Sequence, residues 1–107
     1  MPGESIALTE AVYYILLSLH TPMHGYGIMQ NVSELSGGRV KLAAGTLYGA
    51  LGSMLEKDWI AALPGESNGR KKQYEITPLG RAIAQDELAR LRELMINGEI
   101  IMGGNRR

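Results

Sequence analysis

The chain has 107 residues, no cysteine and a formal net charge of zero, with eleven basic and eleven acidic side chains. This length suffices for one compact core, and the lack of cysteine excludes disulfides, thiolate metal sites and cysteine nucleophiles. Zero net charge argues against a general polyanion binder. Any nucleic-acid role must therefore depend on where the basic residues lie.

No apolar run is long enough to cross a membrane, since the longest, Ala11–Leu19, is far shorter than the roughly 20 residues required. The opening residues, MPGESIALTE, lack the basic segment of a secretory signal. We therefore expect a cytoplasmic protein that has no membrane partner.

The first predicted helix begins after Thr9, a good capping residue, with Glu10 at the positive end of the helix dipole. Its core stripe follows helical spacing: Val12, Ile15, Leu16 and Leu19. The opposite face is also apolar, with Tyr13, Tyr14 and Leu17. A surface helix of a small monomer does not need a second apolar face, so we expect another element to cover it.

A second helix is predicted after Pro22, over Gly25–Leu35. The segment that follows two glycines has alternating character, because Arg39 and Lys41 flank apolar Val40. This pattern predicts a short edge strand with two outward basic side chains.

The third predicted helix, Ala44–Ile60, has two very different faces. Its apolar stripe is Leu47, Leu51, Met54 and Leu55. Its opposite face carries small residues: Thr46, Gly49, Gly52 and Ser53. Two glycines within a helix destabilise it by roughly 1 kcal/mol each relative to alanine, which indicates a surface that something approaches closely. The approaching body is either a nucleic-acid groove or a neighbouring helix.

After the third helix the apolar period changes to two, which predicts strands at Ile60–Leu63 and Lys72–Ile76. The loop between them, Pro64–Lys71, is too long for a tight turn and should project from the body. Thr77 and Pro78 then open a last helix that extends to about residue 102.

This order of elements is that of a winged helix-turn-helix, mostly α with a small β-hairpin. We expect a winged-helix domain over residues 5–77 and a C-terminal dimerisation helix over residues 78–103. In such a fold the third helix enters the major groove, and the hairpin, or wing, contacts the adjacent backbone or minor groove. Five of the eleven basic residues flank these two elements: Arg39, Lys41, Arg70, Lys71 and Lys72.

Four motifs resemble the PadR-like transcriptional regulators: HGYGI at 24–28, GTLYGAL at 45–51, LEKDWI at 55–60 and GRKKQYEITPLG at 69–80. The resemblance implies a homodimeric bacterial repressor whose third helix reads DNA and whose last helix pairs two subunits. It also implies repression that a small molecule relieves. The chain departs from the family at Gly49, where proline often follows the TLY motif, and at Ala43 and Ala44, where a polar cap and proline often begin the helix. The wing also lacks the proline that often follows its GR.

The predicted DNA-binding residues come from the second and third helices, the segment between them and the wing: Tyr26, Arg39, Lys41, Thr46, Tyr48, Gly49, Ser53, Arg70, Lys71 and Lys72. Tyr48 would direct its hydroxyl to a phosphate or simply pack at the edge of the core. For Tyr26, phosphate contact and core packing are both open. Thr46 would touch a base or satisfy backbone groups at the helix start.

A dimer is predicted from the last helix, where apolar or small residues alternate at spacings of four and three: Ala84, Leu88, Leu91, Met95, Gly98 and Met102. The interface residues that we expect are Tyr13, Leu17, Leu88, Leu91, Met95 and Met102. Two-fold symmetry then requires a pseudo-palindromic operator. An apolar or aromatic effector would bind near this interface, as the surplus aromatics Tyr13, Tyr14 and Trp59 suggest, although Trp59 more simply packs beside the wing.

Other classes of function fit the sequence less well. The two histidines, His20 and His24, are separated by a helix-breaking proline, so we expect no metal site and no cofactor. No nucleophile and base have catalytic spacing, which argues against an enzyme. A winged helix that binds only protein is the main alternative, but such an adaptor has no use for the basic wing.

Overall fold

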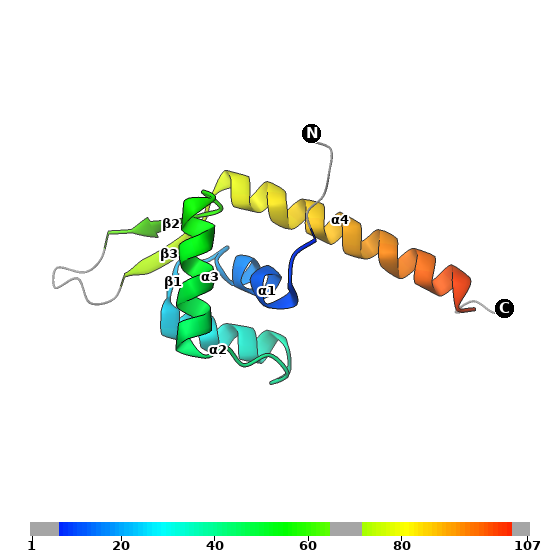
Figure 1. Cartoon of the computed structure of the whole chain (residues 1–107), viewed down its shortest axis with the longest axis horizontal. Helices are drawn as coiled ribbons and strands as arrows, with labels where there is room; N and C mark the ends of the chain where they lie inside the picture. Colours follow the sequence, from blue (N-terminus) through cyan, green and yellow to red (C-terminus); the bar gives the residue numbers. More distant parts are fainter. Residues whose placement is uncertain (1–6, 65–71, 104–107) are drawn as a thin grey trace.

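A computed structural model of the chain describes residues 7–64 and 72–103. The helices are α1 (Glu10–Ser18), α2 (Gly25–Leu35), α3 (Ala44–Glu56) and α4 (Pro78–Ile101), and the strands are β1 (Met23–His24), β2 (Ile60–Leu63) and β3 (Gln73–Ile76). The strands form an antiparallel sheet in the order β1-β3-β2. In Figure 1 the first three helices and the sheet form the body, and α4 runs from it as a long arm. The predicted fold class, mostly α with a small β-hairpin, is confirmed.

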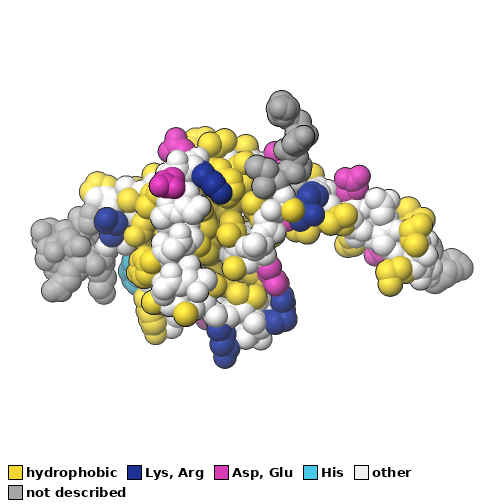
Figure 2. All heavy atoms as spheres, viewed as in Figure 1, with side chains coloured by type: hydrophobic (Ala, Val, Ile, Leu, Met, Phe, Trp, Pro, Cys, Tyr) yellow, Lys and Arg dark blue, Asp and Glu magenta, His cyan; other side chains and the backbone are white. Residues whose placement is uncertain are grey.

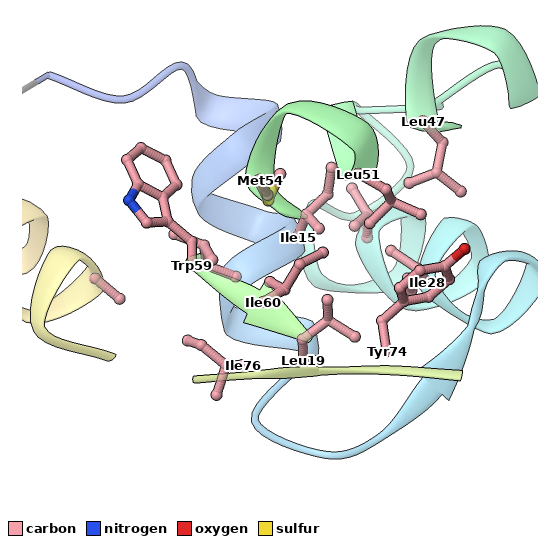
Figure 3. Packing of buried hydrophobic residues seen from close by; sticks show 13 residues of the cluster. Ile15, Leu19, Ile28, Leu47, Leu51, Met54, Trp59, Ile60, Tyr74 and Ile76 are labelled. Atoms are coloured by element: carbon pink, nitrogen blue, oxygen red, sulfur yellow. The ribbon is translucent and has the colours of Figure 1, made fainter. Parts of the chain in front are cut away.

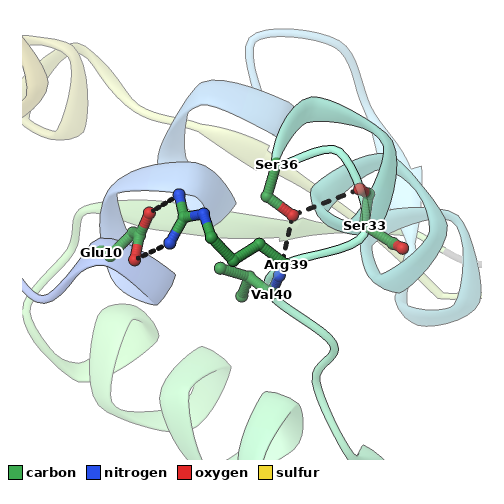
Figure 4. A network of polar contacts seen from close by, with 5 residues as sticks. All are labelled: Glu10, Ser33, Ser36, Arg39 and Val40. Atoms are coloured by element: carbon green, nitrogen blue, oxygen red, sulfur yellow. Dashed lines mark hydrogen bonds and ion pairs between the residues drawn. The ribbon is translucent and has the colours of Figure 1, made fainter.

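The expected edge strand at residues 39–41 is wrong. In the structure the third strand is β1, whose Met23 pairs with Tyr74 and whose His24 pairs with Gln73. The amide of Val40 instead donates to the Ser36 hydroxyl at 2.9 Å, which closes the turn after α2 (Figure 4). A strand of two residues is too short to show alternation, so the sequence pattern did not reveal β1.

The third helix ends four residues earlier than predicted, at Glu56. Asp58 adopts a left-handed backbone conformation with φ of 67°, which aspartate tolerates better than most residues. The Trp59 amide then donates to the Met54 carbonyl at 3.0 Å and reverses the chain into β2.

The core lies between α1, α2, α3 and the sheet (Figure 3). From α3 it receives Leu47, Leu51 and Met54, all almost fully buried. Leu55 was wrongly included in this stripe, because 37% of its surface is exposed. Trp59 is buried where α3 meets β2, which confirms its packing role and removes it from the exposed aromatics.

The first turns of α4 are fastened to the body. Thr77 caps the helix, because its hydroxyl accepts from the Gly80 amide at 3.0 Å. Gly80 lies against the chain at Trp59, where a Cβ would come within 2.0 Å of the Trp59 carbonyl oxygen. Ala84 and Glu87 are the last buried residues of the helix. Beyond them, α4 leaves the body, which gives the molecule extents of 60 × 35 × 21 Å.

Candidate nucleic-acid interface

The small-residue face of α3 is open to solvent. Thr46, Gly49, Gly52 and Ser53 are all exposed, and a Cβ built on Gly49 or Gly52 would meet nothing within 4 Å. Packing against a neighbouring helix of the same chain is therefore excluded among the described residues. In Figure 2 this face forms a band of white atoms down the front of the molecule. The face offers a shallow surface with few side chains to obstruct a close approach.

The opposite face of α3 fixes its position, because Leu47, Leu51 and Met54 anchor it in the core. The start of the helix has no side-chain cap, as the alanines predicted, since Ala43 supplies no side-chain hydrogen bond. The first amides of α3 therefore have no partner within the helix. A helix start with free amides favours a negatively charged neighbour.

The two predicted tyrosine contacts lie near the start of α2. Tyr48 is half exposed, and its hydroxyl lies directly over Gly25, the first residue of α2. Tyr26 is 61% exposed, and its hydroxyl accepts a hydrogen bond from the Gln30 side chain at 3.3 Å. The alternative of core packing is therefore wrong for Tyr26.

The basic residues before α3 differ in their surroundings. Arg39 forms a two-pronged ion pair with Glu10 at the start of α1 (Figure 4). The hydrogen bond from Arg39 lowers the pKa of the Glu10 carboxyl, and the same contact raises the pKa of Arg39. Lys41 is exposed. Arg39 can reach a phosphate only by sharing or leaving Glu10, whereas Lys41 has no ion pair among the described residues.

The wing lies beside α3, with β2 and β3 as its arms (Figure 1). Lys72 is exposed at the start of the β3 arm. The predicted contacts Arg70 and Lys71 lie outside the described residues.

The residues predicted for the dimer interface lie on α1 and α4. Tyr13 and Leu17 of α1 are half-buried and line a shallow groove of about 180 Å³ that also includes Leu88 of α4. Farther along α4, Leu91 is half-buried, and the two methionines of the set are exposed. The structure therefore brings the α1 residues beside the first part of α4 but leaves the end of the helix uncovered.

A second and more enclosed cavity, of about 360 Å³, lies between α1, α4 and the segment before α1. Its lining consists of Leu8, Glu10, Tyr13, Tyr14, Glu87, Arg90 and Leu91. Glu87 is buried and accepts two hydrogen bonds from Arg90, at 2.9 and 2.6 Å. These bonds lower the pKa of the Glu87 carboxyl.

Each histidine is engaged by its own helix end. His20 Nδ1 lies 3.0 Å from the Leu16 carbonyl oxygen, and His24 caps α2 by accepting from the Gly27 amide at 3.4 Å. Among the described residues no group of three or more histidine, aspartate or glutamate side chains could hold a metal ion. None of the described helices is both long and apolar enough to cross a membrane.

Several residues near the site were missed by sequence reasoning. The contact between Gly25 and Tyr48 and the burial of Tyr74 join the starts of α2 and α3 to the sheet. The Glu10–Arg39 pair spans 29 residues, and no local pattern indicates a contact of that range. Gly25, the first glycine of the HGYG motif, was a sequence signal that another group approaches the backbone closely at this position. In the structure that group is Tyr48.

Helix order, sheet topology and the open face of α3 together define a winged helix-turn-helix protein. Residues 14–86 match the transcriptional regulator PadR-like family. Because the match covers more than half of the chain, this protein belongs to the PadR-like family of transcriptional regulators, and the predicted family is confirmed.

The chain is also similar to individual proteins, including solved structures. The chain is 38% identical over 66 residues to an uncharacterised 37.1 kDa protein in transposon TN4556 of Streptomyces fradiae, a match that covers 62% of this chain and 18% of the relative. A PadR family transcription regulator from Clostridium difficile R20291 is similar at 23% identity and a TM-score of 0.72, with 89% of this chain and 100% of that chain covered. A PadR-like transcription factor from Bacteroides fragilis is similar at 27% identity and a TM-score of 0.70, with 84% and 87% covered.

Proposed function

We propose that this DNA-binding regulator acts as a homodimeric repressor on a pseudo-palindromic operator. The observation that carries the proposal is the open small-residue face of α3, held outward by a buried apolar face. A major groove admits a helix, and small side chains let the backbone come close to the base edges. A protein-binding adaptor is the alternative, and it would give no reason for exposed Lys41 and Lys72 beside that face.

In this proposal the site residues have two roles. Thr46, Gly49 and Ser53 face the bases and set sequence preference. The remaining residues position the duplex through its phosphates: Tyr26, Arg39, Lys41, Tyr48, Arg70, Lys71 and Lys72. Release of counterions from those phosphates makes affinity depend steeply on salt.

Selection of bound sequences from a random duplex pool tests this proposal and yields the operator. With that operator, log affinity should fall with log salt by about 0.9 per phosphate neutralised. Replacing Lys41 and Lys72 by alanine should weaken all duplexes similarly and flatten the slope, whereas Thr46→Val should change the preferred sequence. Failure of the wild-type protein to bind any duplex at low salt would refute the proposal.

The dimer is proposed to form through α4, the 78–103 unit of the predicted division. Beyond Glu87 the helix exposes a run of large apolar side chains: Leu88, Leu94, Met95, Ile96, Ile100, Ile101 and Met102. Yellow atoms mark this run along the arm in Figure 2. A second copy, related by two-fold symmetry, would cover it together with the exposed parts of Tyr13 and Leu17.

Light scattering tests this interface at micromolar concentration. Leu91→Glu should yield monomers, and Met95→Glu should do the same without disturbing the protomer, because Met95 is 56% exposed. Glu93→Gln, which changes an exposed side chain of the same helix, provides the control. A dimer that survives both charged variants would place the interface elsewhere.

An apolar or aromatic effector is proposed to bind the 360 Å³ cavity between α1 and α4. Its walls are mostly apolar, and Tyr13 lies in both this cavity and the predicted dimer interface. Ligand and DNA would then weaken each other equally, as thermodynamic linkage requires. Titration calorimetry with an aromatic panel, with and without operator, tests the proposal, and Tyr13→Ala should reduce binding. Absence of heat from every compound would argue for effector-free repression.

A further inference from the structure

We propose that the hydroxyl groups of Tyr48 and Tyr74, with the first amides of α2, bind one phosphate of the operator backbone. This inference rests on the DNA-binding role proposed above. It adds Tyr74, which comes from the sheet and not from the helix-turn-helix, and it explains the glycine at the start of α2.

The Tyr48 hydroxyl packs directly against the backbone of Gly25. A Cβ added to Gly25 would lie 2.1 Å from the Tyr48 hydroxyl oxygen and 2.7 Å from the ring carbon that bears it. Gly25 is not among the glycines with positive φ, so its backbone does not itself require glycine. Close approach of the phenol is therefore the reason for glycine, and it places a hydroxyl at the start of the helix.

Tyr74 supplies a second hydroxyl, which has no hydrogen-bond partner in the described part of the chain. Only 8% of its surface is exposed, and within the described residues its hydroxyl forms no hydrogen bond. Its strand pairs it with Met23, two residues before α2 begins. In Figure 3 its ring extends from β3 towards Ile28 of α2, with the oxygen at the far end. Burial raises the pKa of Tyr74, and the charge of Tyr48 raises it further.

These groups together suit an oxyanion. The amides of Gly25 and Tyr26 have no acceptor within their helix, and they lie at the positive end of its dipole. Leaving a buried hydroxyl such as that of Tyr74 without a partner is unfavourable, and a phosphodiester oxygen would satisfy it. All four donors are neutral. They therefore strengthen binding without adding to the counterions released, and the salt slope should not depend on them.

Tyr74→Phe tests the inference with little change of shape. We expect operator affinity to fall about tenfold at every salt concentration, with an unchanged log–log slope, because a hydrogen bond to a charged acceptor is lost. Thermal stability should stay the same or rise, since a buried hydroxyl without a partner is removed. A solely structural role would instead lower stability and leave the affinity of the folded protein unchanged.

Gly25→Ala offers an independent variant that still folds, because the Tyr48 side chain is half exposed and can swing away. It should weaken operator binding to a similar extent. Gly27→Ala is the matched control, because its Cβ would meet its nearest neighbours at an ordinary 3.8 Å.

Duplexes with single methylphosphonate substitutions can locate the contact. One position in each half-site should weaken wild-type binding and have no further effect on Tyr74→Phe, as coupled partners do in a double-mutant cycle. If the wild type binds its operator and Tyr74→Phe binds equally well, the inference is wrong while the proposed function stands. If the wild type binds no duplex, the proposed function itself fails.

Discussion

The body of the molecule buries its large apolar side chains, whereas the outer half of α4 exposes them. In the body, α1, α2, α3 and the sheet bury a continuous cluster, and Ile15, Leu16 and Val32 have no exposed surface. At the end of α4, Ile101 and the C-cap residue Met102 are more than 80% exposed. Large exposed apolar patches mark interaction surfaces, so the outer half of α4 is the part that we propose to associate with a second copy.

At the boundary between the two regions, the buried Glu87 side chain forms hydrogen bonds with other parts of the chain. Glu87, only 3% exposed, accepts from Arg90 and from the amide of Leu8, the latter at 3.4 Å. This network ties the segment before α1 to the point where α4 leaves the body. The body should therefore set the free energy of unfolding of the protomer, and the outer half should set its association.

The largest expected difference comes from equal truncations in the two regions. Leu51→Ala should lower the free energy of unfolding by about 2–5 kcal/mol, because it leaves a cavity in the core. Met95→Ala should change the stability of the dilute protomer by less than about 0.5 kcal/mol, as is usual for surface positions. Urea denaturation monitored by circular dichroism measures both.

Protein concentration sharpens this first test. If the outer half of α4 forms the dimer, Met95→Ala should reduce the dependence of the melting temperature on concentration, while Leu51→Ala should lower that temperature at all concentrations. Equal losses in the two variants at low concentration would contradict the division into two regions.

The sequence predicted the body better than the surface contacts. Helical spacing and the cap at Thr9 placed α1, α2 and α4 correctly, because local capping and apolar period dictate them. The end of α3 was misjudged, because it depends on the left-handed conformation of Asp58. The small-residue face of α3 was predicted from the sequence and is exposed in the structure, whereas the DNA contacts of individual residues stay predictions. The Glu10–Arg39 pair depends on tertiary packing, which no local pattern encodes. The contact of Tyr48 with Gly25 also depends on tertiary packing, and its only local signal was the glycine itself.

Two glycines of α4 provide the next comparison. Gly80→Ala should lower the free energy of unfolding by about 1–3 kcal/mol, because the new methyl group would collide with the Trp59 carbonyl oxygen in a packed region. Gly98→Ala should raise helix stability by up to about 1 kcal/mol, because a Cβ there meets nothing within 4 Å in the protomer. Thermal denaturation distinguishes the expected loss of stability in Gly80→Ala from the expected gain in Gly98→Ala. A loss of dimer in Gly98→Ala would show that the partner's backbone approaches the helix at this glycine.

The smallest expected effect is an acid sensitivity at the boundary between the regions. The hydrogen bonds from Arg90 hold the pKa of the Glu87 carboxyl below its ordinary value of 4.5. A carboxyl with a lowered folded-state pKa stabilises the fold fully above its unfolded value and loses that contribution as pH falls through the folded value. The difference in free energy of unfolding between wild type and Glu87→Gln should therefore be constant at neutral pH and shrink below about pH 4.5.

Urea titrations of both proteins between neutral pH and the acid range measure this difference directly. Glu93→Gln serves as the matched control, because Glu93 is exposed on the same helix and forms no ion pair with any described residue. The difference in free energy of unfolding between Glu93→Gln and wild type should vary less with pH than that of Glu87→Gln. Hydrogen exchange should also show that the Leu8 amide loses protection over the same acid interval, since Glu87 is its acceptor. A Glu87→Gln difference that persists unchanged into acid would mean that the Glu87 charge does not fasten α4 to the body.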